Sequence, residues 1–480
     1  MMDPLADRAA LGNALDLVVT EARRYFDSLD SRLVRSPDAD EAARTFDRAF
    51  PEQGEGAAKA LTELVEAAAT ASLHSSGPRF FHWVMGGSTP AALGADWLAS
   101  AFDQVASAWE TSPLATQLEL VSIDWLKELF GLPASWGGVL TTGATMANFT
   151  GLAAARRWWG ERHGIDVDEH GLAGLPAVPV LSSGYIHPSS LKALAMLGVG
   201  RGRVQTFTRD AVGRVDLDRL ESALRDLGGA PAILIANAGE VNAGDFDPID
   251  AMADLAERYS AWLHVDGAFG LFARVTPTTA PLAEGVERAD SVISDGHKWL
   301  NVPYDCGFAF IRDASALART FRISAAYLPP ADGSTPMFAV RGPEMSRRAR
   351  GFATWATLRA YGRGGYRAMI ERHLELAQRI AQQVVAAPDL EILAETKLNI
   401  VCFRYRPATV PENELNALNA RLGEAVLEDG RVYVGTTDYG GRTAFRPAIV
   451  NWRTQEEDVD LLVNVIRELG ARLVAEPVSA

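Results

Sequence analysis

A single lysine, Lys298, lies in the stretch SDGHKWLNVPYDCGFAF at residues 294–310, with apolar, strand-like sequence on both sides. Burying a charged amine without a partner is costly, so this position calls for a specific role. A lysine in a mostly apolar crevice loses proton affinity, which suits its amine to form a Schiff base with a carbonyl group. The alternative is that the side chain extends to the surface, as most lysines do.

Two further polar side chains also stand at the ends of predicted strands. Asp266 ends the run WLHVD and precedes the small residues Gly267 and Ala268, which leave room for a ligand. A buried carboxylate needs a cation or hydrogen-bond donors, and a structural carboxylate that caps a loop is the alternative. His187 precedes a helix in HPSSLKA, where an imidazole can stack on a flat ring, act as an acid or base, or cap the helix.

A polar turn follows the first predicted strand of this region. The strand is predicted to end at Leu140, and residues 141–143 then lead into a helix that starts near Ala144. The free N–H groups at a helix start form an anion site, Gly143 allows close approach, and Thr145 adds a hydroxyl donor. The alternative is an ordinary capped helix start.

These features occur in one order along the chain, each at the end of a predicted strand. Pyridoxal phosphate requires the same parts: an anion site for its phosphate, a stacking partner for its ring, an acid partner for its pyridine nitrogen and a lysine for its aldehyde. The order therefore predicts a pyridoxal-phosphate site that includes Gly143, Ala144, Thr145, His187, Asp266 and Lys298.

The elements that would position this site alternate between strand and helix. Strands are predicted at residues 137–140, 177–183, 203–208, 231–239, 261–270, 289–296 and 306–313. Helices are predicted between them at residues 145–162, 188–198, 217–227 and 249–260. This alternation indicates an α/β fold with a mostly parallel sheet, in which ligands bind at the carboxyl ends of the strands.

The flanking regions differ from this central part. Residues 14–30 and 57–73 have the apolar spacing of amphipathic helices. A long helix at 366–387 leads to strands at 390–395, 400–406 and 432–439 and a closing helix at 454–474, which together indicate a small α+β domain. We therefore predict an N-terminal helical segment (1–75), a large domain (76–360) and a small domain (361–480). The Gly-, Pro- and aromatic-rich stretch at 74–93 is either a loop lining the site or a buried connector.

Several motifs resemble one enzyme family, the group II pyridoxal-phosphate-dependent amino-acid decarboxylases, which include aromatic-amino-acid and glutamate decarboxylases. The motifs are SDGHKWLNVPYDCG, HVDGAFG, HPSSLKA, FHWVMGGSTPAAL with SPLATQLE, and SRRARGFATWATLRAYG. The resemblance extends from about residue 30 to 470. It implies the type I, aminotransferase-like fold with a seven-stranded sheet, and a homodimer with active sites at the subunit interface and N-terminal helices packed on the partner.

The resemblance also implies a role for each matching residue. Lys298 would form the Schiff base with pyridoxal phosphate, Asp266 would contact the pyridine nitrogen, and His187 and Ala268 would lie on opposite faces of the ring. The turn at Gly143, Ala144 and Thr145 would bind the phosphate, with Asp295 and His297 nearby. The implied reaction is decarboxylation of an L-amino acid to an amine and CO₂. Trp83, Val84 and Met85 match one wall of the substrate pocket, where no cation stands, which favours an aromatic or apolar substrate over glutamate.

Two departures from the family pattern bear on the reaction. Family members commonly have hydroxyl residues where this chain has NAGEVNAG, so Asn237 and Glu240–Val241 replace hydroxyl residues, and Asn237 can still donate a hydrogen bond to the ring oxygen or the substrate. The family's decarboxylases usually carry a loop tyrosine that returns a proton to the substrate Cα, and here that position falls near Phe338. In relatives this exchange is associated with oxidative deamination, so an aldehyde synthase is the alternative. A non-catalytic relative that binds the cofactor is a third hypothesis, which the intact Lys298, Asp266 and His187 argue against.

Composition excludes other classes of protein. A net charge of −15 argues against nucleic acid or an anionic membrane as partner. Two cysteines, no N-terminal signal sequence and no long apolar run lead us to expect a cytoplasmic protein. The acidic and histidine cluster at 161–171 fits no metal-site spacing and is expected to be a solvated loop, so no metal is predicted. The basic SRRAR at 346–350 is expected to form internal ion pairs near the dimer interface.

Overall fold

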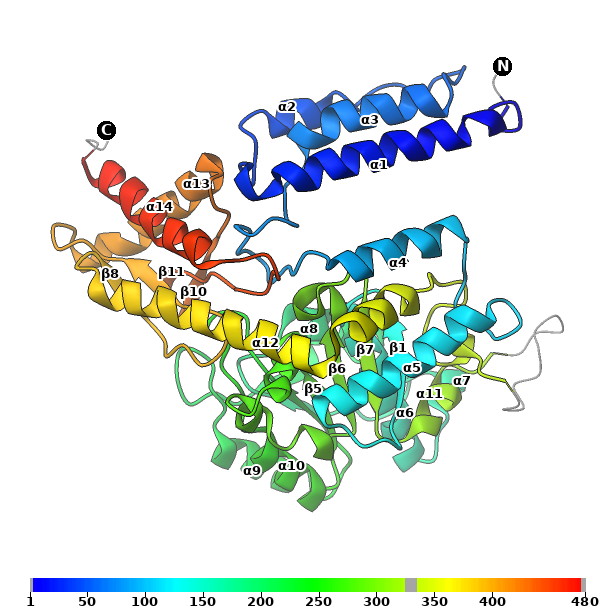
Figure 1. Cartoon of the computed structure of the whole chain (residues 1–480). Helices are drawn as coiled ribbons and strands as arrows, with labels where there is room; N and C mark the ends of the chain where they lie inside the picture. The colour runs from blue at the N-terminus through cyan, green and yellow to red at the C-terminus, as the bar shows by residue number, and fades with distance from the viewer. Residues whose placement is uncertain (1–2, 324–334, 476–480) are drawn as a thin grey trace.

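A seven-stranded sheet forms the centre of the large domain in the computed structural model, which describes residues 3–323 and 335–475 (Figure 1). Its strands, in the spatial order β1-β7-β6-β5-β4-β2-β3, are β1 (Gly137–Thr141), β2 (Val180–Ser182), β3 (Val204–Thr206), β4 (Ile233–Asn237), β5 (Trp262–Asp266), β6 (Ser291–Asp295) and β7 (Gly307–Ile311). Only β7 runs antiparallel to its neighbours in this sheet. The predicted mostly parallel α/β sheet is confirmed, and β1 extends one residue beyond the predicted end at Leu140.

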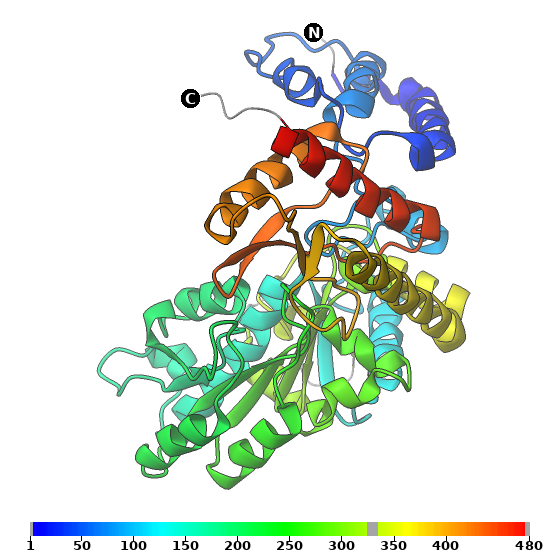
Figure 2. The same ribbon diagram turned by 90° about the vertical axis from the view of Figure 1, so that its left-hand side faces the viewer.

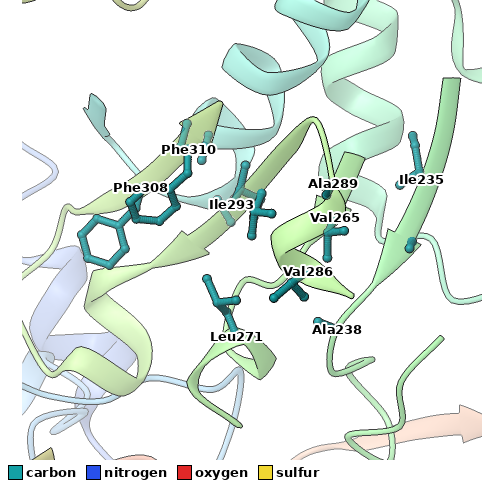
Figure 3. Close-up of a cluster of buried hydrophobic side chains, with 14 of the residues drawn as sticks. Ile235, Ala238, Val265, Leu271, Val286, Ala289, Ile293, Phe308 and Phe310 are labelled. Atoms are coloured by element: carbon teal, nitrogen blue, oxygen red, sulfur yellow. The ribbon is translucent and has the colours of Figure 1, made fainter. Parts of the chain in front are cut away.

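The middle strands are buried on both faces, which explains their continuous apolar sequence. Figure 3 shows apolar side chains from four neighbouring strands packed together: Ile235, Val265, Ile293, Phe308 and Phe310. Leu271 and Val286, from short helical turns after β5, close over this cluster. The core thus fixes the strands whose carboxyl ends carry the predicted site.

Helices cover the sheet and connect its strands. They are α4 (Pro90–Ala101), α5 (Pro113–Phe130), α6 (Ala144–Arg162), α7 (Val167–His170), α8 (Pro188–Met196), α9 (Leu217–Asp226), α10 (Ile249–Arg258) and α11 (Ala314–Thr320). The sequence shows why α5 has these ends: Ser112 caps its first turn, and Gly131 ends it with a left-handed φ of 68°.

The expected solvated loop at 161–171 is in part a helix. Asp166 caps α7, and Asp168 is paired with Arg156 and Arg157 of α6. These acidic residues therefore neutralise arginines at the surface of α6. In residues 3–323 and 335–475 there is no group of three or more His, Cys, Asp or Glu side chains that could hold a metal ion.

The small domain follows a long helix, α12 (Gly351–Ala386), which is kinked at Gly362 where φ is 58°. It contains a four-stranded sheet in the order β10-β11-β9-β8, formed by β8 (Leu390–Ile392), β9 (Phe403–Tyr405), β10 (Thr436–Tyr439) and β11 (Arg442–Phe445), and two helices, α13 (Leu415–Asp429) and α14 (Glu456–Ala475). The predicted α+β character is confirmed. The helix predicted from 366 begins at Gly351, and β11 was not predicted.

The N-terminal region consists of α1 (Leu11–Ser28), α2 (Ala39–Arg44) and α3 (Ala57–Ala71). Figures 1 and 2 show these helices grouped beside the small domain, away from the large sheet. Neither α1 nor α3 buries a residue, although both have an apolar face. The domain boundaries at 75/76 and 360/361 stay predictions.

The stretch at 74–93 is a partly buried connector, and it also contacts the segment that carries Lys298. Phe80 and Phe81 are buried, α4 already begins at Pro90, and the Gly86 N–H donates to the His297 carbonyl at 3.2 Å. A Cβ on Gly86 would lie 1.7 Å from the Lys298 carbonyl oxygen, so glycine is required there. Within the described part of the chain, no helix is long and apolar enough to cross a membrane.

Candidate active site

Polar side chains converge at the carboxyl edge of the large sheet. Asn237, Asp266 and Asp295 are the last residues of β4, β5 and β6, and Asn237 is the direct cross-strand neighbour of Asp266. Lys298 follows β6, and His187 lies between β2 and α8. The structure thus brings together the residues that the sequence placed at strand ends, as expected for parallel strands.

Lys298 lies in a short helical turn, Gly296–Leu300, and its own backbone leaves helical geometry with φ −92° and ψ −106°. Its side chain is only 16% exposed, so it does not extend to the surface. The ammonium lies 3.5 Å from Asp295 Oδ2 and 5.9 Å from the centre of the Phe269 ring. Asp295 therefore supplies the counter-charge that the burial of Lys298 requires.

Asp295 is itself nearly inaccessible. Burial raises the pKa of its carboxyl, but the positive charges of Lys298 and His297 outweigh burial and hold the pKa below its usual range. His297 Nε2 lies 3.3 Å from Asp295 Oδ2, and the His297 ring stacks on Tyr304 with centroids 4.1 Å apart. Asp295 Oδ1 has no hydrogen-bond partner among the described residues.

The turn after β1 has the geometry of an anion site. Gly143 has a φ of 140°, in the region that favours glycine, and as the N-cap residue of the 19-residue helix α6 it has no side chain to cap the first turn. A Cβ on Gly143 would lie 2.9 Å from His297 Cε1 and 3.4 Å from Asp295 Oδ1, so the turn packs against both side chains. The uncapped N–H groups near Ala144 and Thr145 thus lie beside the Lys298 segment.

Asp266 is held by three hydrogen-bond donors. Its Oδ2 accepts from Asn148 Nδ2 at 2.8 Å and from Ser190 Oγ at 3.2 Å, and its Oδ1 accepts from the Ala268 N–H at 3.2 Å. The side chain is 6% exposed. Each partner donates a hydrogen bond to a carboxylate oxygen. This arrangement supplies the donors expected for a buried carboxylate.

His187 caps helix α8, which was one of the roles predicted for it from the sequence. Its Nδ1 accepts from the Ser189 N–H at 3.2 Å and lies 2.7 Å from Ser189 Oγ. Burial lowers the pKa of His187, and the positive charges of Lys298 and Arg446 lower it further. The negative charges of Asp266 and Asp295 act in the opposite direction but do not cancel this effect. The imidazole is therefore neutral near pH 7. A capping role and a ring-facing role are compatible, because the cap uses Nδ1 only.

Comparison with known proteins decides the family. A family model described as "Pyridoxal-dependent decarboxylase conserved domain" matches residues 40–406. The chain belongs to the pyridoxal-dependent decarboxylases. The resemblance read from the motifs is thereby confirmed, and pyridoxal phosphate is the cofactor of this family.

Individual relatives cover almost the whole chain. It is 29% identical over 465 residues to the aromatic-L-amino-acid decarboxylase of Bacillus atrophaeus, which covers 95% of this chain and 94% of that relative. It is 29% identical over 416 residues to the phenylacetaldehyde synthase of Arabidopsis thaliana, with 84% and 83% covered. The crystal structure of Oryza sativa TDC with PLP and tryptamine has a TM-score of 0.90 and 26% identity, and the match covers 98% of this chain and 100% of that one.

The residues of this decarboxylase-family site fit pyridoxal phosphate. The glycine turn with uncapped N–H groups fits a phosphate, and the three-donor Asp266 fits a protonated pyridine nitrogen. Lys298 is buried beside a carboxylate and fits the aldehyde. The contacts of Thr145, His297 and Ala268 with the cofactor stay predictions.

Asn237 and Glu240 mark where this chain departs from other family members. The Asn237 amide donates to Asp247 Oδ2 at 3.0 Å and to Ser183 Oγ at 3.4 Å, so its N–H groups already have partners within the protein. Its contact with the cofactor stays a prediction. Glu240 accepts the N–H of Asn242 at 2.8 Å, and burial raises the pKa of its carboxyl.

One cation at the site, Arg446, was not predicted from the sequence. It comes from the small domain and donates to the Val241 carbonyl at 3.0 Å, and no carboxylate of the described residues lies within ion-pairing distance. Burial lowers the pKa of Arg446, and its charge contributes to the lowered pKa of His187. Burial and the Arg446 charge also lower the pKa of His82 to about 4. Only the folding of the small domain over the large one reveals this residue.

The predicted substrate wall contains one aromatic residue, Trp83, which has aromatic neighbours. Trp83 is 53% exposed and lies against His82, with ring centroids 4.2 Å apart, while Phe80 stacks on Tyr433 at 5.2 Å. Val84 is buried in the core of the large domain and Met85 is half-buried beside Phe80. The roles of Trp83, Val84 and Met85 in substrate binding stay predictions.

Phe338 is fully buried in a short helical turn, Phe338–Val340. The guanidinium groups of Arg341 and Arg347 lie 4.9 Å and 5.5 Å from its ring centre. The preceding part of the loop, residues 324–334 with Tyr327, lies outside the described residues. The match of Phe338 to the family's loop tyrosine stays a prediction.

The SRRAR segment forms the internal ion pairs that were predicted. Arg347 pairs with Glu119, Arg348 with Asp96 and Arg350 with Asp305. Whether these pairs lie near a subunit interface stays a prediction.

Proposed function

We propose that this protein removes CO₂ from an L-amino acid with an aromatic or apolar side chain and releases the amine. The observation that carries the proposal is the convergence of Lys298, Asp266 and His187 at the sheet edge of a pyridoxal-dependent decarboxylase fold. Support for the aromatic class comes from the Bacillus relative named for aromatic L-amino acids and from the aromatic residues around Trp83.

When bound, pyridoxal phosphate supplies an electron sink for the electron pair left by departing CO₂. Lys298 would hold the cofactor through its amine and give up that place to the substrate amine. Asp266, held by three donors, would face the pyridine nitrogen and hold a proton there. Such a charged contact contributes a few kcal/mol to lowering the barrier, or about 10²–10³ in rate.

Arg446 is the residue best suited to receive a substrate carboxylate. Its guanidinium is half-buried, lacks an ion-pair partner among the described residues and acts electrostatically on His187. A planar guanidinium matches a carboxylate with two hydrogen bonds. We therefore propose that Arg446 orients the α-carboxylate.

A panel of the twenty amino acids, assayed together for CO₂, ammonia and peroxide, tests the reaction. We expect CO₂ and amine from aromatic or apolar substrates, without ammonia or peroxide. Lys298→Ala should abolish turnover and the visible absorbance of the bound cofactor, while the exposed Lys192→Ala is the matched control. Cofactor binding without any product would instead indicate a non-catalytic relative.

A comparison of substrate with product tests Arg446. If Arg446 binds the α-carboxylate, Arg446→Gln should weaken binding of the amino acid at least tenfold and leave binding of the corresponding amine within about twofold, since a lost charged pair costs a factor of ten for every ~1.4 kcal/mol. Equal weakening of both ligands would exclude this role.

An aldehyde synthase is the second candidate, favoured by Phe338 and by similarity to the Arabidopsis phenylacetaldehyde synthase. In that reaction an amino acid, O₂ and water give the aldehyde, CO₂, ammonia and H₂O₂, and O₂ is the oxidant. The product ratio of Phe338→Tyr decides: a shift from aldehyde to amine supports the synthase, and an unchanged ratio excludes it. Phe338→Leu controls for altered packing without adding a hydroxyl.

We further propose a homodimer in which α1 and α3 pack on the second copy. Support comes from the apolar face that these helices leave exposed, which includes Leu11 (64% exposed), Leu15 (56%) and Leu64 (53%). Exposed apolar patches of this kind mark interaction surfaces. Sedimentation analysis should find a dimer that Leu15→Arg/Leu64→Arg dissociates, whereas Val385→Arg at the exposed end of α12 should not. A monomeric wild-type protein would exclude the proposal.

A cytoplasmic location is proposed from cysteine usage. Cys306 and Cys402 are both buried and not joined to each other, as is usual in a reducing compartment. Cell fractionation followed by immunodetection tests this, and recovery with an extracytoplasmic fraction would contradict it.

A further inference from the structure

We propose that four buried side chains, Trp262, Ser291, His264 and Asn148, form a one-directional hydrogen-bond chain that ends on Asp266 and positions its carboxylate. We call this set the aspartate relay. It rests on the proposed function in one respect, because Asp266 acts on the reaction only when a pyridine ring lies opposite it. The relay residues are positioning residues, since each acts through Asp266.

The first half of the relay is fixed by chemistry that allows one direction. Trp262 Nε1 donates to Ser291 Oγ at 2.9 Å, and an indole nitrogen can only donate. Ser291 Oγ lies 2.7 Å from His264 Nδ1. Because Ser291 accepts from the indole, its own proton is free to be donated to Nδ1.

The second half is fixed from the other end by the carboxylate. Asn148 Nδ2 lies 2.8 Å from Asp266 Oδ2, and an ionised carboxylate only accepts, so the amide N–H₂ faces Asp266. The Asn148 oxygen therefore faces His264, whose Nε2 lies 2.8 Å from it. His264 must carry its proton on Nε2 and accept at Nδ1, which agrees with the direction set by Trp262.

The relay is sealed inside the protein. His264, Asn148 and Ser291 are fully buried, and a Cβ on Gly151 would lie 2.8 Å from His264 Cε1, so the ring cannot turn over without moving α6. Burial lowers the pKa of His264 to about 4, which keeps the imidazole neutral. A neutral ring has one donor and one acceptor, as the relay requires.

The strand period explains how the chain builds this relay. Trp262, His264 and Asp266 alternate along β5 and so face the same side of the sheet. Ser291 of β6 is the direct neighbour of His264, and Asn148 lies one helical turn after the start of α6. The W-x-H-x-D pattern therefore delivers three of the five groups, and the two flanking elements supply the others.

The consequence concerns the orientation of the Asn148 amide. Without the His264 proton, the contact of Asn148 Nδ2 with Ser189 Oγ at 3.1 Å is left to orient the amide, which can then turn its oxygen toward Asp266. A turned amide withdraws one hydrogen-bond donor from Asp266, and the carboxylate then competes with the pyridine nitrogen for the proton that they share. Loss of the relay should therefore act on ring protonation and on cofactor affinity, beyond any general loss of stability.

Ring-nitrogen NMR of the holoenzyme, loaded with pyridoxal phosphate labelled with ¹⁵N in the ring, tests the proposal. The wild type should show a protonated nitrogen, and His264→Leu should move the signal toward the unprotonated position and weaken cofactor binding about tenfold or more. His264→Gln retains a donor and should restore affinity to within about threefold. His373→Leu, at another fully buried histidine, is the control and should leave the nitrogen signal unchanged.

The outcomes separate the relay from the proposed function. If the wild type does not bind pyridoxal phosphate, the proposed function fails. If Asp266→Ala loses ring protonation but a folded His264→Leu retains it, only the relay is wrong. Should His264→Leu not fold, the histidine tautomer in the wild type decides: ¹⁵N-histidine spectra, assigned with His264→Gln, must show the Nε2–H form, and the Nδ1–H form would overturn the relay.

Discussion

Replacing Arg347 by methionine would break a fully buried ion pair. Arg347 and Glu119 have side chains 2% and 0% exposed, and two nitrogen–oxygen contacts of 2.8 Å and 2.9 Å join them. Arg347 also donates to the carbonyls of Ala106 and Leu140, while Glu119 Oε1 accepts the Leu140 N–H at 2.9 Å. The pair therefore holds the strand β1 just before the predicted phosphate turn.

The magnitude follows from what remains after the change. Leaving a buried carboxylate without its partner costs about 3–5 kcal/mol, and each orphaned carbonyl costs about 1–3 kcal/mol. Since these costs are not additive, we expect the free energy of unfolding to fall by about 4 kcal/mol in Arg347→Met. Glu119→Gln keeps an oxygen that accepts the Leu140 N–H but removes the negative charge. The Arg347 guanidinium is then buried without a counter-charge, so the free energy of unfolding should fall by a similar amount. The double variant has no unpaired charge and should recover about 2 kcal/mol of the summed costs.

Urea unfolding followed by circular dichroism, at one protein concentration, measures these differences. The neighbouring Arg348→Met is the matched control, because the Arg348–Asp96 pair at 2.8 Å is exposed and should be worth less than about 1 kcal/mol. Single variants that each lose less than 1 kcal/mol, or costs that simply add in the double variant, would refute a coupled buried pair.

Two further predictions concern the lysine segment and acid stability. Gly86→Ala would place a methyl group 1.7 Å from the Lys298 carbonyl oxygen and should abolish cofactor binding, measured by absorbance titration. The control Gly94→Ala in α4, where no atom lies within 4 Å of the added carbon, should bind the cofactor normally. Normal binding by both variants would show that the backbone around Lys298 can move to accept the methyl group, which would contradict the prediction. Burial lowers the pKa of His264 to about 4 and that of His373 to about 3, whereas both have a pKa of 6.5 in the unfolded chain. Between pH 6.5 and these lower values, the unfolded chain therefore binds more protons than the folded protein. Stability should fall as pH drops from about 6.5 to 4, by about 3 kcal/mol for His264, and His373→Gln should flatten part of the slope in urea titrations; an unchanged slope would contradict this account.

The sequence predicted the residues that follow strands, because local pattern determines them. Strand period and helix-start chemistry are encoded within a few residues, so Asp266, Lys298 and the turn at Gly143 were found at the carboxyl edge where parallel strands place them. The middle strands β4, β5, β6 and β7 were predicted for the same reason, since buried strands have continuous apolar sequence. Asn148 could have been found by the same reasoning, since it lies one helical turn beyond Ala144.

Other groups depend on contacts between distant parts of the chain. Arg446 reaches the site only because the small domain folds against the loop after β4, and its neighbours in sequence show no such pattern. Gly86 lies against the Lys298 carbonyl, more than two hundred residues away in sequence. The solvated loop expected at 161–171 became an ion-paired helical turn because Arg156 and Arg157, on the preceding helix, face it. Local sequence pattern alone does not predict such contacts between residues that are distant in the chain.

Phe338, which is predicted to affect the product, and the strand before the turn that is predicted to bind phosphate both contact one buried arginine, Arg347. The Arg347 guanidinium lies 5.5 Å from the centre of the Phe338 ring and donates to the Leu140 carbonyl, one residue before the end of β1. The backbone on either side of Phe338 is also fixed, because the Ala339 N–H donates to Ser107 and the Trp109 N–H to Pro336. A hydroxyl added at Phe338 therefore enters a packed, charged environment, and its effect can reach the cofactor through Arg347. For this reason a product shift in Phe338→Tyr supports proton delivery only if Phe338→Leu, which loosens the same contact, leaves the amine-to-aldehyde ratio unchanged.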